Sequence, residues 1–214
     1  NSNDMRIPGE DAVGVVTAVD FLGDLERDGD VHVGERVTVI GGGFTAMDAC
    51  RTAVRKGATE VTCLYRRSRT EMPAHKSEVD EAEEEGVRLE LLCAPVRVVT
   101  DDANRVTGIE MQRMQLGEPD ASGRRRPVAI EGSEFVVECD QVITAIGQYP
   151  NLDGTTEEQG IGRTKWRTIK VDDWTYQTAN PRVFAGGDAV LGAQTVIQAV
   201  AQGKKAAWSM DAFL

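Results

Sequence analysis

The sequence predicts an α/β fold of three layers, in which a parallel sheet is interrupted by an antiparallel meander. Two observations carry this prediction. Between Arg36 and Leu92, short β-branched runs alternate with helical patterns in the order β-α-β-α-β, which favours a parallel sheet. After Pro95 the helical pattern is replaced by successive extended segments, before a last buried strand at 141–146.

The parallel part has clear boundaries. Strands are expected at 36–40, 60–65 and 87–92. The first helix is expected to end at Gly57 and carries one apolar stripe, formed by Ala46, Cys50, Ala53 and Val54. The second helix is expected to open at Pro73 and to close at Gly86.

The second half of the chain reads differently. Extended segments at 95–102, 104–114 and 134–147 are separated by Asp-Asp and by a polar loop at 116–126, which contains a basic triplet expected to be a solvated turn. Short strands are expected at 168–173 and within 182–190. A final helix at 195–213 carries an apolar face, formed by Val196, Ala199, Val200, Gly203 and Ala207.

Composition limits the function. The 214 residues carry a net charge of −11, which argues against nucleic acid or an anionic membrane as the main partner. The acidic run at 77–86 is expected to be a solvated helix face, with a docking surface for a basic partner as the alternative. No run approaches the roughly 20 apolar residues of a membrane span, and no signal peptide is visible.

The cysteines and histidines indicate no local metal or redox site. The four cysteines form no CxxC pair, so no zinc site, iron–sulfur cluster or dithiol centre is expected. His32 and His75 have no nucleophile or ligand at a useful spacing. Free thiols without a signal peptide favour a cytoplasmic location.

The residues after the first strand, Gly41 to Ala46, have the form GxGxxA. Gly41 permits the tight turn, Gly43 lets the backbone approach a pyrophosphate at the helix N-terminus, and Ala46 permits close helix–strand packing. Because the motif follows a strand and opens a helix, it predicts a Rossmann-like dinucleotide-binding domain. A purely structural glycine turn is the alternative.

The end of the second strand indicates which dinucleotide is bound. An NAD site normally places a carboxylate there for the ribose 2′-hydroxyl. This sequence instead continues with Arg66, Arg67 and Arg69, whose guanidinium groups suit a 2′-phosphate. We therefore expect NADPH rather than NADH, with a solvated basic loop as the alternative.

Near the C-terminus, a Gly-Gly turn ends in Asp188 and can place one carboxylate against a hydroxylated ligand, although a simple Asp turn is the alternative. Thr195 and its neighbours then lie at a helix N-terminus. No catalytic triad, carboxylate pair or cysteine nucleophile is apparent, so no catalytic side chain is assigned. This absence does not argue against hydride transfer between bound cofactors. In such a reaction the cofactors carry the chemistry, and no catalytic side chain is needed.

Four segments together resemble the small (beta) subunits of NADPH-dependent glutamate synthases and their relatives among FAD-dependent pyridine nucleotide oxidoreductases. In chain order they are "RIPGED", "VIGGGFTAMDACRTAVRKGATEVTCLYRRSRTEMPA", "TAIGQYPN" and "FAGGDAVLGAQTVIQAVAQGKKAA". The long second segment is the most specific of the four.

The resemblance implies the following site residues. Gly41, Gly43, Thr45 and Ala46 would hold the NADP pyrophosphate, and Arg66 and Arg67 the 2′-phosphate. Ala145, Ile146 and Gly147 would pass near the nucleotides; Gly187 and Asp188 would bind the FAD ribitol; and Gln194, Thr195 and Val196 would cap the flavin. Phe44 departs from the more usual polar residue, which affects a side-chain contact but not the backbone cradle.

The resemblance also predicts that the chain is a fragment. Residues 1–33 would be a linker or part of the FAD domain, 34–147 the NADP domain, and 148–214 the C-terminal part of the FAD domain. The expected partners are an N-terminal FAD and iron–sulfur portion and an electron-accepting subunit. The chain alone is expected neither to retain FAD nor to turn over. A nucleotide-binding module without redox turnover is the alternative, and the missing CxxC argues against a thioredoxin-reductase-like enzyme.

Overall fold

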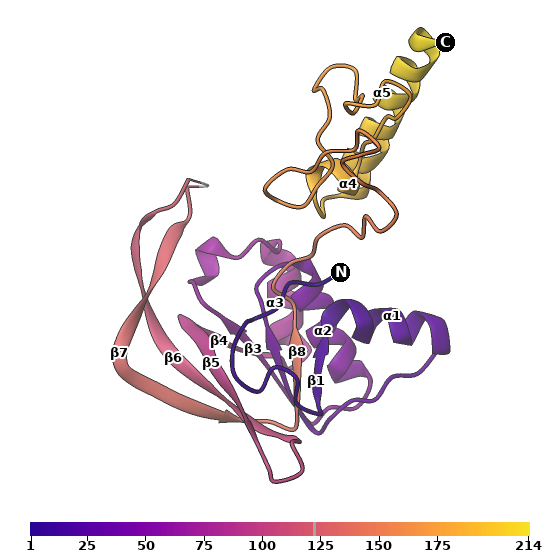
Figure 1. Ribbon diagram of the computed structural model, residues 1–214. Helices are drawn as coiled ribbons and strands as arrows, with labels where there is room; N and C mark the ends of the chain where they lie inside the picture. Colours follow the sequence, from indigo (N-terminus) through magenta and orange to yellow (C-terminus); the bar gives the residue numbers. More distant parts are fainter. Residues whose placement is uncertain (122) are drawn as a thin grey trace. The chain divides into compact units, whose positions relative to one another are not determined.

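The structure is a computed structural model that describes residues 1–121 and 123–214. It divides the chain into two compact units (Figure 1). We call Ser2–Ile146 the sheet unit, and we call Gly147–Leu214 together with Asn1 the tail unit. Of residues 1–33, expected to be a linker or part of the FAD domain, residues 2–33 lie within the sheet unit.

The sheet unit is built on five parallel strands in the order β1-β8-β2-β3-β4. Their bounds are β1 Val15–Thr17, β2 Arg36–Ile40, β3 Glu60–Tyr65, β4 Arg88–Leu91 and β8 Gln141–Thr144. The strands expected at 36–40, 60–65 and 87–92 are therefore confirmed, the third within one residue at each end. Strand β8 pairs with both β1 and β2, so the chain returns to the middle of the sheet.

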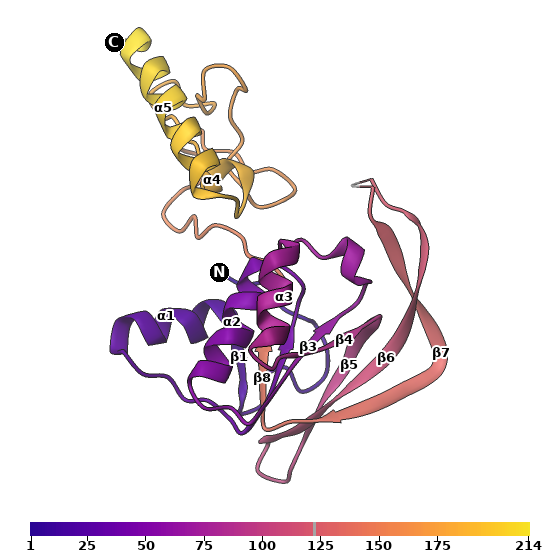
Figure 2. The same ribbon diagram turned by 180° about the vertical axis from the view of Figure 1, so that it is seen from behind.

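Helices cover one face of this sheet, and the meander covers the other (Figures 1 and 2). The helices are α1 Ala18–Asp28, α2 Phe44–Arg55 and α3 Lys76–Glu84. In β2 the side chain of Val39 packs among the helices, whereas that of Ile40 packs against the meander. This alternation follows from the two-residue period of a strand. The predicted three layers are thus helix, parallel sheet and antiparallel sheet.

The meander consists of β5 Cys93–Thr100, β6 Val106–Pro119 and β7 Arg125–Glu138 in antiparallel order. The prediction of a polar loop at 116–126 is wrong, because the loop is shorter. The pairing of β6 with β7 continues to Pro119 and Arg125. Arg125 and Arg126 of the basic triplet therefore belong to a strand rather than to a turn. Cross-strand pairing holds these polar residues in extended strands, although their composition alone suggests a loop.

The helices of the sheet unit differ from expectation at two places. The helix expected from Pro73 begins at Lys76, because residues 69–71 form a 3-10 turn, η1, and the amide of Ala74 donates to Gly42 O at 3.2 Å. Helix α1 was not expected. Thr17 caps it by accepting a hydrogen bond from the Asp20 amide, and its Phe21 is fully buried in the core.

The tail unit contains α4 Asp188–Leu191, α5 Val196–Phe213 and a small core of Leu152, Ile161 and Ile169. The strands expected at 168–173 and within 182–190 are wrong: among the described residues these segments form only single bridges, at Ile169 and at Phe184. A strand needs a paired neighbour along its length, which sequence pattern alone does not supply. The final helix is confirmed, but its expected apolar face is largely exposed, with Val196 78% accessible.

Candidate functional site

The glycine loop between β2 and α2 is tightly packed on one side. Gly41 has φ 153°, and a Cβ there would overlap the carbonyl oxygen of Ala145, at the end of β8. A Cβ on Gly42 would lie 2.6 Å from the ring of Tyr65, in β3. The first two glycines are therefore required by the fold itself, because neighbouring strands approach the loop closely.

The third glycine has a different environment. Gly43 has an ordinary extended backbone, with φ −97°, and a Cβ there would meet nothing within 4 Å. It is the N-cap of α2, and no side chain caps this helix terminus. The loop thus leaves open space beside a helix N-terminus, which is the arrangement that receives a phosphate group on backbone N–H donors.

The next three residues begin helix α2. Ala46 is fully buried, as expected for close helix–strand packing. Thr45 is half-buried, and Phe44 is 41% exposed. The Phe44 ring meets the ring of His75 edge to face, with centroids 5.1 Å apart. The Phe44 ring is therefore held against His75, the N-cap residue of α3.

The two arginines that follow β3 have different roles. Arg66 is exposed, and within the described chain its guanidinium forms no hydrogen bond or ion pair. Arg67 is buried: its Nη2 lies 2.7 Å from Asp120 Oδ2, and its Nε donates to Arg125 O at 2.8 Å. The two arginines of the expected pair therefore differ, because Arg67 fastens the end of β3 to the tip of the β6–β7 hairpin.

Arg69 and the acidic run also pair within the chain. Arg69 Nη2 lies 2.5 Å from Asp80 and 2.6 Å from Glu83, both in α3. On the other side of α3, Arg51 of α2 forms ion pairs with Glu81 and Glu85. Its hydrogen bond lowers the pKa of Glu85. Much of the charge of residues 77–86 is therefore balanced locally, which weakens the idea of a docking surface for a basic partner.

The end of β8 lies against the glycine loop. Ala145 donates its amide to Ile40 O at 2.8 Å, and its carbonyl faces Gly41. Ile146 is 37% exposed at the end of the sheet unit. Gly147 begins the tail unit with φ 102°. Of the three strand-end residues expected near a nucleotide, Ala145 is thus held directly beside the loop.

The other expected residues form a second cluster within the tail unit. Asp188 is exposed at the start of α4, and its Oδ1 accepts from the amide of Gln194 at 3.3 Å. Gly187 has φ 66°, a conformation that favours glycine, and its amide donates to Gln202 Oε1 at 2.8 Å. Thr195 caps α5, and Val196 follows it at the exposed end of that helix.

The cysteines are buried and unpaired, at Cys50, Cys63, Cys93 and Cys139. Burial raises the pKa of Cys93 to about 12 and that of Cys139 to about 11. Burial also raises the pKa of Cys50 well above its ordinary value, and a hydrogen bond with Cys63 adds to this effect. Since the thiolate is the reactive form, these thiols are suited to packing and not to redox chemistry.

We predict that the native chain reacts slowly with a thiol reagent at about pH 8, and that denaturant releases the full reactivity. Because folding raises the pKa of Cys93 and Cys139 above their ordinary value of 9.0, stability should fall as pH rises from 9.0 toward about 11. Urea unfolding at several pH values measures this fall. Thiol labelling at the unfolded rate in native buffer would contradict the prediction.

No group of three or more His, Cys, Asp or Glu side chains among the described residues could hold a metal ion. None of the helices in the described part of the chain has the length and apolar character to cross a membrane.

The chain is similar to known proteins along its whole length. Residues 1–203 match the family described as pyridine nucleotide-disulphide oxidoreductase. The chain is 49% identical, over its full length, to the NADP(+)-dependent formate dehydrogenase subunit beta of Moorella thermoacetica, of which it covers 30%. It is 42% identical, over 92% of its length, to the glutamate synthase [NADPH] small chain of Escherichia coli, of which it covers 45%.

Comparison of structures agrees with this result at the level of fold. The thioredoxin reductase of T. acidophilum superposes with a TM-score of 0.74 and 20% identity, covering 99% of this chain and 62% of that one. The chain spans less than half the length of the two curated relatives above, both of which are named as parts of larger assemblies. The matched residues and the shared fold place this chain in the pyridine nucleotide-disulphide oxidoreductase family.

Proposed function

We propose that the sheet unit binds NADPH at the carboxyl edge of its parallel strands, and that in the intact protein a hydride passes between NADPH and FAD. The tail unit would supply the C-terminal part of the FAD site. Ligands of doubly wound sheets bind at this carboxyl edge, where the glycine loop and the end of β3 both lie.

The observation that carries this proposal is the open space at Gly43. The loop packs tightly at Gly41 and Gly42 but is empty where a pyrophosphate would meet the uncapped start of α2. Thr45 and Ala46 continue this first turn. The helix N-terminus supplies donors and a favourable field to such a group.

The preference for NADPH rests on Arg66. It is exposed at the end of β3, where an NAD site would carry a carboxylate, and no group in the described chain neutralises it. A guanidinium at this position favours a 2′-phosphate. The names of the relatives from Moorella thermoacetica and Escherichia coli both specify the phosphorylated cofactor.

The FAD proposal rests on the tail-unit cluster. Asp188 presents its carboxylate at the surface beside Gly187 and can accept hydrogen bonds from ribitol hydroxyls. Gln194, Thr195 and Val196 would lie against the flavin ring. The bound flavin would supply the hydride chemistry, and this chain would bind and orient the nucleotide.

Several apolar side chains of α5 would then be covered by the remainder of the FAD domain: Val196, Ile197, Val200, Trp208 and Phe213. Exposed apolar area of this kind marks an interaction surface. We further propose an electron-accepting partner subunit and a cytoplasmic location. The names of the two relatives, a subunit and a small chain, support the partner subunit. The four unpaired thiols support the cytoplasmic location.

The proposal is tested by calorimetric titration of the full chain with NADPH and with NADH at one ionic strength. We predict tighter binding of NADPH, and we predict that Arg66→Ala raises the Kd for NADPH about tenfold while leaving that for NADH unchanged. Arg88→Ala is the control. Arg88 is the first residue of β4, so it lies toward the amino ends of the parallel strands and away from the carboxyl edge. Equal binding of both cofactors, or binding of neither, would refute the proposal.

A further inference from the structure

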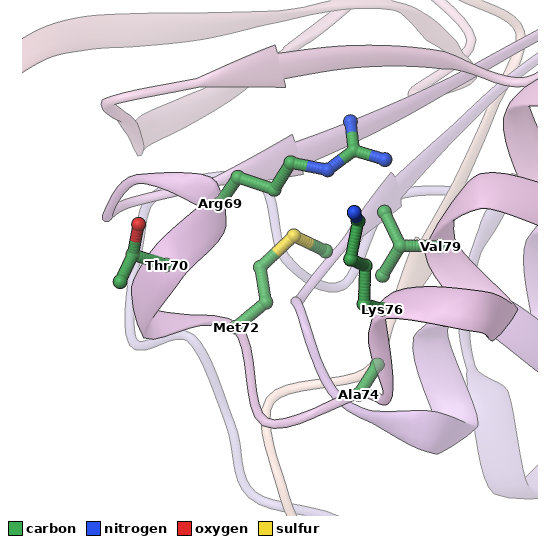
Figure 3. Close-up of a pocket in the computed structure, with 6 residues that line it drawn as sticks. All are labelled: Arg69, Thr70, Met72, Ala74, Lys76 and Val79. Carbon is green, nitrogen blue, oxygen red and sulfur yellow. The ribbon is translucent and has the colours of Figure 1, made fainter.

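A cavity of about 410 Å³ lies between η1 and the start of α3 (Figure 3). Met72, Ala74 and Val79 are buried and form its apolar wall. Arg69 and Lys76 bring charge to it, and in Figure 3 the Arg69 side chain lies above Met72 while that of Lys76 stands beside it. The cavity therefore combines an apolar surface with cationic groups at its edge.

This cavity adjoins the proposed nucleotide site. The amide of Ala74, which lines it, donates to Gly42 O in the glycine loop. Tyr65, the last residue of β3, packs against Gly42 and donates its hydroxyl to Glu71 O in η1 at 2.8 Å. A dinucleotide whose pyrophosphate lies at Gly43 thus has the cavity beside it, near the strand end where the ribose 2′-position is read.

The cations near this strand end are not equivalent. Arg67 is buried and paired with Asp120, and Arg69 is paired with Asp80 and Glu83. Lys76 is exposed, and within the described chain its ammonium forms no hydrogen bond or ion pair. Together with Arg66, it is therefore available to an incoming anion.

We propose that Lys76 is a specificity-determining residue, which contacts the 2′-phosphate of NADPH from the α3 side while the cavity receives the adenosine end. This inference rests on the proposed NADPH site. Arg66 is the first cation at the 2′-phosphate, and Lys76 takes the place of the buried Arg67 as the second. An ammonium acts as a flexible point charge, so it can reach a phosphate without the fixed geometry of a guanidinium.

The experiment compares 2′,5′-ADP with 5′-AMP, which differ only by the 2′-phosphate, in calorimetric titrations of the full chain. Lys76→Ala should raise the Kd for 2′,5′-ADP about tenfold and leave that for 5′-AMP unchanged, whereas Lys76→Arg should stay within about threefold of wild type. Lys56→Ala is the matched control. Lys56 is the other lysine of the sheet unit, and its Nζ donates to Gly29 O, beyond the far end of α2.

The outcomes separate this inference from the proposed function. A tenfold loss with Lys76→Ala, absent with Lys56→Ala, supports the role of Lys76. If Lys76→Ala leaves the preference for 2′,5′-ADP intact while Arg66→Ala removes it, the inference is wrong and the NADPH site stands. A wild-type chain that binds neither 2′,5′-ADP nor NADPH would overturn both. Circular dichroism of each variant checks that it is folded.

Discussion

Replacing Gly43 by valine is expected to weaken NADPH binding by about a hundredfold or more, since the side chain would occupy the space proposed for the pyrophosphate. The fold should tolerate the change. The backbone of Gly43 is extended, and a Cβ there meets nothing within 4 Å. Calorimetry measures the loss of binding, and thermal unfolding followed by circular dichroism measures stability.

Gly41→Ala is the matched control two residues away. Gly41 has φ 153°, and an added Cβ would overlap the Ala145 carbonyl oxygen. The substitution should therefore lower the unfolding free energy by about 2 kcal/mol or more. The two variants should therefore separate binding from stability within one loop. If Gly43→Val binds NADPH as tightly as wild type, the pyrophosphate does not lie at this helix terminus.

The second large effect is expected from Arg67→Ala, which should cost about 3 kcal/mol of unfolding free energy, at the low end for a buried ion pair. The arginine side chain is only 6% exposed, and its loss leaves Asp120, 22% exposed, without this partner. The Arg125 carbonyl loses a donor as well. Removing the guanidinium is costly because the Asp120 carboxylate stays partly desolvated and loses this charged partner.

Replacing both partners, with Arg67→Met and Asp120→Leu, should restore part of this stability, because the partly buried carboxylate is then removed together with the guanidinium. The measurement should be urea unfolding followed by far-ultraviolet circular dichroism. Tryptophan fluorescence would report the tail unit, which contains Trp166, Trp174 and Trp208. A stability of Arg67→Ala equal to wild type would show that this pair does not fasten β3 to the hairpin.

The glycine loop could be predicted from sequence because its constraints are local. The tight turn at Gly41 and the helix that starts at Phe44 depend on residues only a few positions apart. Helix α1 also carries a local signal in the sequence. Thr17 and Asp20 stand at capping positions, and Gly29 closes the helix.

The roles of the cations could not be predicted in this way. Arg66 and Arg67 are adjacent, and only the fold distinguishes them, because Asp120 lies 53 positions after Arg67. The sequence does not single out Lys76, because it stands beside an acidic run that suggests a solvated face. It lines the same cavity as Ala74, whose amide donates to the glycine loop. This position depends on a tertiary contact that the local sequence does not show.

The apolar stripe of α5 illustrates a different limit. Periodicity correctly predicts a helix at this position, but it does not identify what covers the apolar face. Val196 and Val200 are exposed in the structure, although their spacing is that of core residues. What covers such a face is decided by contacts that the spacing does not encode.

A crystal structure of the full chain with NADP⁺ would decide whether the proposed nucleotide site is correct. We predict the pyrophosphate at Gly43 and the start of α2, with the 2′-phosphate between Arg66 and Lys76. Nucleotide density elsewhere on the chain, or a 2′-phosphate that contacts neither cation, would contradict it.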